Sequence, residues 1–119
     1  MAAQTSFEKR KLSGSTNGKM IKVVATATPG TTIHTATSTS GEMDEITLYA
    51  VNSDTSAIKL TVEFGGTTSP DDTIELTIPP ESGFVKVVER LLVDGGVLVR
   101  AFACSANLVM IDGYVIRMS

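Results

Sequence analysis

The residue types that most often carry out chemistry are sparse in this sequence. His34 is the only histidine and Cys104 the only cysteine among 119 residues. A Ser-His-Asp triad would need His34, yet the Gly-x-Ser-x-Gly turn that presents the nucleophile in one large class of triad enzymes does not occur. One histidine and one cysteine cannot complete a tetrahedral zinc site. We therefore expect His34 to be structural, and we expect no catalytic centre, metal or cofactor.

Two short segments superficially match ligand-binding loops, and neither has the required spacing. Asp71 and Asp72 could supply oxygen ligands to calcium, but they fit no calcium loop, and a turn begun by Pro70 explains them. The segment 14–19 (Gly-Ser-Thr-Asn-Gly-Lys) has three residues between its glycines, whereas a phosphate-binding loop has four. Both segments are predicted to be ordinary turns.

Other polar residues have a structural explanation that needs no function. Cys104 lies in an apolar strand without a neighbouring base, which predicts a buried and unreactive thiol. Arg100 and Arg117 interrupt apolar runs and are either paired inside the protein or anchors of an interface. Four acids are expected to be solvated: Asp44, Glu45, Glu75 and Glu81.

Length and charge limit the possible functions further. The chain is long enough for one domain with its own core. It has 10 basic and 13 acidic residues, no Trp and only six other aromatic residues, so the folded body lacks a surface for nucleic acid. No run approaches the ~20 apolar residues that cross a bilayer. With a single cysteine, no internal disulfide can form.

The periodicity of the apolar residues predicts an all-β fold. In Ile58–Phe64 and again in Thr73–Ile78, apolar residues alternate with polar ones, which is typical of half-buried antiparallel strands. Gly, Pro, Asn and Asp turns separate further expected strands at 20–28, 31–37, 45–52, 84–91, 97–104 and 107–117. About eight short strands indicate a β-sandwich of the jelly-roll or immunoglobulin-like type. The segment 85–93 could instead be a short helix.

Residues 1–19 differ in composition from the rest of the chain. They are polar and rich in turn-forming residues, and four of the ten basic residues lie there. We expect an N-terminal arm over 1–19, outside the core of a sandwich domain over 20–119. A terminal tail without a role is the alternative.

Four segments resemble small proteins encoded among the virion genes of tailed bacteriophages. They are Lys19–Ala36 (KMIKVVATATPGTTIHTA), Glu45–Asn52 (EITLYAVN), Leu60–Asp72 (LTVEFGGTTSPDD) and Val99–Ala103 (VRAFA). The likeness extends over nearly the whole chain from about residue 11. It implies an oligomeric β-sandwich without enzymatic activity, located on the virion after folding in the cytoplasm of the bacterial host.

The resemblance favours a capsid decoration (cement) protein, with a homotrimer at threefold axes of the head. The partner would be the major capsid protein or another virion protein. The arm would anchor it through Phe7, Lys9, Arg10, Lys11 and Leu12. The oligomer interface would contain Leu108, Met110, Tyr114 and Ile116, because the C-terminal run is apolar on both faces. The alternatives are a neck, head–tail or tail-surface protein, or a carbohydrate-binding module, against which the absence of Trp counts.

Overall fold

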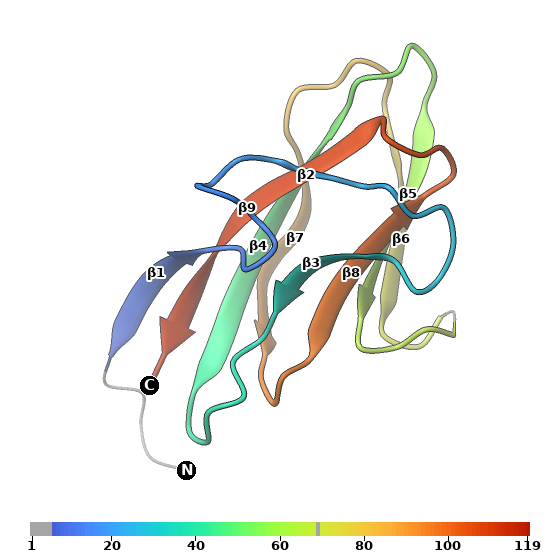
Figure 1. Ribbon diagram of the computed structural model, residues 1–119. Helices are drawn as coiled ribbons and strands as arrows, with labels where there is room; N and C mark the ends of the chain where they lie inside the picture. Colours follow the sequence, from blue (N-terminus) through green and yellow to red (C-terminus); the bar gives the residue numbers. More distant parts are fainter. Residues whose placement is uncertain (1–5, 69) are drawn as a thin grey trace.

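The chain folds into nine strands without a helix in the residues that the structure, a computed structural model, describes: 6–68 and 70–119. The strands are β1 (Phe7–Lys11), β2 (Ile21–Lys22), β3 (Thr31–Thr35), β4 (Met43–Asn52), β5 (Ile58–Phe64), β6 (Thr73–Ile78), β7 (Val85–Val93), β8 (Leu98–Ala103) and β9 (Val109–Met118). Sheet A has the order β1-β9-β4-β7, with β2 also paired to β9, and sheet B has the order β3-β8-β5-β6. The two sheets pack face to face as a sandwich (Figure 1). The predicted all-β class is confirmed.

Four of the strand pairs are nested within one another. They are β2 with β9, β3 with β8, β4 with β7, and β5 with β6, all antiparallel. The chain is thus one long hairpin with its tip at the β5–β6 turn, rolled up so that β9 also pairs with β4 and β8 with β5. This is jelly-roll topology. Of the two sandwich types that the sequence left open, the chain adopts the jelly roll.

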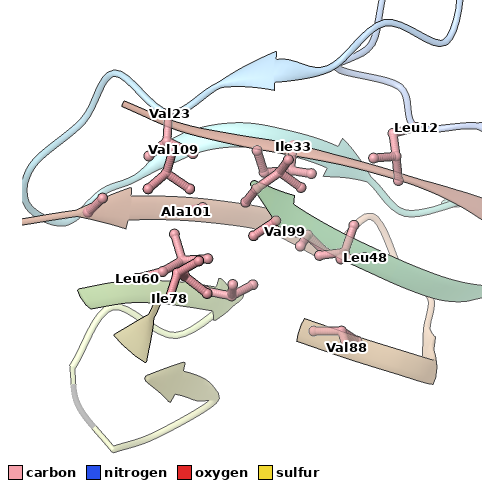
Figure 2. Close-up of a cluster of buried hydrophobic side chains, with 14 of the residues drawn as sticks. Leu12, Val23, Ile33, Leu48, Leu60, Ile78, Val88, Val99, Ala101 and Val109 are labelled. Atoms are coloured by element: carbon pink, nitrogen blue, oxygen red, sulfur yellow. The ribbon is translucent and has the colours of Figure 1, made fainter. Parts of the chain in front are cut away.

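Aliphatic side chains from both sheets fill the space between them (Figure 2). The largest fully buried ones are Leu12, Ile33, Ile46, Leu48, Ile58, Leu60, Ile78 and Ile111. Each such side chain contributes roughly 1.5–3 kcal/mol relative to an exposed one. The predicted strands Ile58–Phe64 and Thr73–Ile78 have the expected bounds, and Ile58, Leu60 and Val62 point into the core.

The expectation of an arm outside the core does not hold for the segment around β1. β1 pairs with β9 along its whole length (Figure 1), and Leu12 is only 1% exposed between the sheets. The backbone N–H of Gly14 donates to the carbonyl of Ile33 in β3. Polar residues conceal this strand in the sequence, because an edge strand over open solvent needs few apolar side chains. The core therefore begins well before residue 19, the predicted boundary.

Two other predicted elements differ in extent or type. Of the expected strand at 20–28, only β2 is a strand; after it, Val23 and Ala25 make isolated backbone hydrogen bonds as the chain leaves sheet A and crosses to sheet B. The segment 85–93 is strand β7 rather than a helix, and its register against β4 shifts near Leu48. No helix of the described residues is long and apolar enough to span a bilayer.

Candidate functional site

The outer face of sheet A carries apolar side chains that the core does not use. In β4, Ile46, Leu48 and Ala50 are fully buried, so the alternate residues point away from the core. Two of these alternate residues, Tyr49 and Val51, are only partly buried. Both faces of this central strand are therefore apolar, although only one of them is covered within the chain.

The register extends this surface across the sheet. Met118 lies opposite both Phe7 in β1 and Met43 in β4. Ile116 lies between Lys9 and Glu45, and Glu45 is also opposite Leu92 in β7. We call the following set the apolar face: Phe7, Met43, Tyr49, Val51, Phe84, Leu92, Met110, Tyr114, Ile116 and Met118. Phe7, Phe84 and Leu92 are each more than half exposed.

A shallow hollow lies within the apolar face. It has a volume of about 260 Å³ and is lined by Tyr49, Phe84, Asp112, Gly113 and Tyr114. The rings of Tyr49 and Phe84 meet edge to face with their centroids 5.8 Å apart. An aromatic-lined hollow of this kind suits an inserted anchor side chain of a partner protein.

Basic residues border the apolar face along β1 and β2. Lys9 lies over the ring of Tyr114, with its ammonium 5.6 Å from the ring centroid, and Lys22 is opposite Met110. Up to residue 22 the chain has five basic and one acidic residue, whereas residues 23–119 have five basic and twelve acidic residues. The β1–β2 side is therefore positive in an otherwise acidic protein, which favours an acidic partner surface there.

The residues predicted for the arm and the interface do not all reach this face. Phe7, Lys9 and Lys11 point outward, but Leu12 is in the core and cannot contact a partner. Arg10 points to the other side of β1 and forms an ion pair with Glu8. Of the predicted interface residues, Met110, Tyr114 and Ile116 lie on the apolar face, whereas Leu108 precedes β9 and packs against the core.

Sequence reasoning missed the contributions of β4 and β7 to this face. The signal was present in Met43–Asn52, where apolar residues occur at both odd and even positions and therefore on both faces of the strand. A strand that is apolar on both faces needs a packing partner on each face. The C-terminal run indicated this for β9, and the sequence of β4 indicates it equally.

A buried ionic cluster joins the two sheets near the apolar face. His34 of β3 and Asp44 of β4 are 2% and 0% exposed, and the His34 Nε2 lies 2.9 Å from Asp44 Oδ2. Arg117 of β9 donates to Asp44 from Nε at 2.7 Å and from Nη2 at 3.0 Å. The backbone N–H of Thr37 donates to the same carboxylate at 3.0 Å. Asp44, expected to be solvated, is therefore the most enclosed acid of the described residues.

The hydrogen bonds of this cluster determine the tautomer of His34 and favour the charged forms of Asp44 and Arg117. The backbone N–H of Ser13 donates to His34 Nδ1 at 3.0 Å, so Nε2 carries the proton and donates to Asp44. Neither ring nitrogen is left to act as a base, in agreement with a structural His34. Burial raises the pKa of Asp44, but the hydrogen bonds from Arg117, His34 and Thr37 outweigh it, and that pKa lies below its ordinary value. The same hydrogen bond from Arg117 raises the pKa of the guanidinium.

Cys104 contradicts the expectation of a buried thiol. β8 ends at Ala103, and the chain turns there, so the side chain of Cys104 is exposed. Within residues 6–68 and 70–119, no three His, Cys, Asp or Glu side chains are grouped so that they could hold a metal ion.

Comparison with known proteins gave no assignment: no protein-family model, no curated protein and no solved structure matches the chain.

Proposed function

We propose that the protein is a structural component of a tailed-bacteriophage virion that decorates the outer surface of the head. The observation that carries this proposal is the apolar face of sheet A. A cluster of exposed apolar side chains on one face of a small domain marks a site of association, since leaving such side chains in water is unfavourable. The resemblance of four segments to virion proteins supplies the choice of partner.

The mechanism follows from selective binding. A protein that binds only the assembled shell stabilises it, because disassembly then also requires loss of the bound copies. The apolar face would cover the boundary between neighbouring capsid subunits, an aromatic-lined hollow would receive an anchor side chain, and Lys9 and Lys11 would meet acidic groups at the rim. A position at the neck, at the head–tail junction or on the tail would use the same face.

Binding to undecorated heads tests the proposal. Leu92→Glu, on the apolar face, is expected to lower the affinity at least tenfold, since a hot-spot contact exceeds about 1.4 kcal/mol. Val24→Glu is the matched control, because Val24 is 56% exposed, close to the 54% of Leu92, and lies outside sheet A. Occupancy is counted on particles by electron microscopy.

Three results are informative. Selective loss of occupancy for Leu92→Glu supports docking through sheet A. Equal loss for both variants contradicts a role for that face. If wild-type protein binds the neck or tail and not the head, the decoration proposal is wrong and the alternative position on the virion is supported.

We also propose that the protein assembles as a homotrimer. The copies would bury between them the part of the apolar face that does not contact the capsid shell. Light scattering at micromolar concentration is then expected to give about three times the 12.5 kDa of one chain. Ile116→Glu, at a residue of the predicted oligomer interface, should shift that mass toward the monomer. A mass of one chain for the wild type would contradict self-assembly and leave head binding to be tested separately.

A further inference from the structure

A groove crosses the outer face of sheet B, on the side of the sandwich opposite the apolar face. Its volume is about 400 Å³, and its lining residues are Thr26, Thr28, Lys59, Thr61, Glu63, Thr67, Thr73, Glu75, Phe102 and Cys104. Half of them are threonines. They come from β5, β6, the end of β8, and the loops before β3 and after β5. Segments that are far apart in the sequence therefore converge on one concave surface.

One wall of the groove is held in place by a buried carboxylate. Glu63 of β5 is 1% exposed, and it accepts hydrogen bonds from Thr28 Oγ1 at 2.5 Å and from the backbone N–H of Gly30 at 2.8 Å. Gly30 lies so close to β8 that a Cβ there would be 2.5 Å from the backbone of Ala101. The loop that carries Thr26 and Thr28 is therefore fixed against sheet B, and the groove is preformed.

The floor combines one aromatic ring with hydroxyl groups. Thr61 of β5 lies opposite Phe102 of β8 on one side and opposite Glu75 of β6 on the other. Thr73 lies opposite Glu63 in the next row. Each threonine hydroxyl can donate one hydrogen bond and accept others, and the partly buried ring of Phe102 offers an apolar patch between them.

The charges of the groove restrict the ligand. Lys59 forms an ion pair with Glu75 at 2.5 Å, and this hydrogen bond raises the pKa of Lys59, which stays charged. Lys59 and two carboxylates leave a net negative lining, so phosphates and carboxylates are disfavoured. A fitting ligand is uncharged, carries several hydroxyl groups and has an apolar face.

We propose that this groove binds a neutral saccharide. The hydroxyls of the exposed and partly exposed threonines and the carboxylate of Glu75 would hydrogen-bond to the sugar hydroxyls, and one face of the sugar ring would lie against Phe102, while the buried Glu63 only holds the loop of Thr28 in place. The proposal goes beyond virion decoration and does not depend on it. In a protein docked through sheet A, the groove would stay open toward the surroundings, where cell-surface glycans are met.

Binding is tested in solution with glucose, galactose, mannose and N-acetylglucosamine, each followed by amide chemical shifts of the full chain. At least one of them should bind with a Kd on the order of 1 mM, as expected for a ligand of about a dozen non-hydrogen atoms. The largest shifts should occur at Thr61, Thr73 and Phe102, and alkylation of Cys104 should be slowed by the same sugar. Inorganic phosphate serves as the charged probe and should not bind.

Two variants locate the site. Thr73→Val keeps the shape and removes one hydroxyl from the groove lining, and it should weaken binding roughly fivefold to tenfold. Phe102→Ala should weaken it more, whereas Phe84→Ala, which removes a ring from the opposite face, should leave it unchanged. The proposal is overturned if none of the four sugars causes shifts at tens of millimolar, if phosphate binds equally well, or if both groove variants bind as the wild type does.

Discussion

Replacement of Asp44 by asparagine is expected to lower the free energy of unfolding by about 3 kcal/mol. The substitution keeps the volume of the side chain but removes the negative charge that accepts hydrogen bonds from His34, Thr37 and Arg117. The loss should lie at the lower end for a broken buried ion pair, because the side chain of Arg117 is 22% exposed and can turn to water. Urea denaturation of the wild type and the variant measures the difference.

The pH dependence of stability checks the origin of this effect. The pKa of Asp44 is lower in the folded protein than its ordinary value, so its contribution is complete above the ordinary value. That contribution is lost as the pH falls through the lowered pKa of the folded state. The wild type should therefore approach Asp44→Asn in stability only in acid. A constant difference at every pH would contradict an ionic origin. Glu89→Gln, in the exposed pair with Lys86, is the control and should cost less than about 0.5 kcal/mol.

Replacement of Gly113 by alanine is expected to cost about 2–4 kcal/mol of stability, from backbone strain and overpacking together. Gly113 lies within β9 opposite Leu48 and has φ +154°, a conformation that side chains disfavour. A Cβ at this position would lie 2.0 Å from the carbonyl oxygen of Thr47. The central pair of sheet A would have to separate locally, which urea denaturation would register as a lower midpoint.

Gly83→Ala provides the matched control. Gly83 has no positive φ, and no atom lies within 4 Å of a Cβ built there. Substitution by alanine should therefore change the free energy of unfolding by less than about 0.5 kcal/mol. Equal losses at positions 83 and 113 would mean that the contact between β9 and β4 is not as close as described.

The sequence predicted the strands whose two faces differ. In β5 and β6, inward apolar and outward polar residues alternate, and the bounds are those of the structure. β1 escaped detection because it lies at an edge and its side chains are all exposed. Its place in the sheet depends on backbone pairing with β9, which a sequence pattern does not encode. Leu12 was assigned to the same polar segment, although within the described part of that segment, residues 6–19, it is the side chain that turns into the core.

Candidate sites were harder to predict because they depend on which residues meet. Met110, Tyr114 and Ile116 could be selected from one run that is apolar on both faces, and the structure adds Met43 and Tyr49 from β4. The groove of sheet B combines residues from several separate segments, and each looks like a surface threonine or acid in isolation. Asp44 was misjudged for the same reason, since its partners are 10 and 73 residues away in the chain.

The nested pairing of strands also bears on how the chain can close its loops. The β5–β6 hairpin joins neighbouring segments, whereas β2 and β9 are separated by most of the sequence. Closing a long loop in an open chain has a larger entropic cost than closing a short one, and folds dominated by such distant pairs fold slowly. When the pairs form outward from the β5–β6 tip, each completed pair brings the next two strands together. By the time β2 and β9 pair, the strands between them are already paired, so only a short loop remains to be closed and its entropic cost is small.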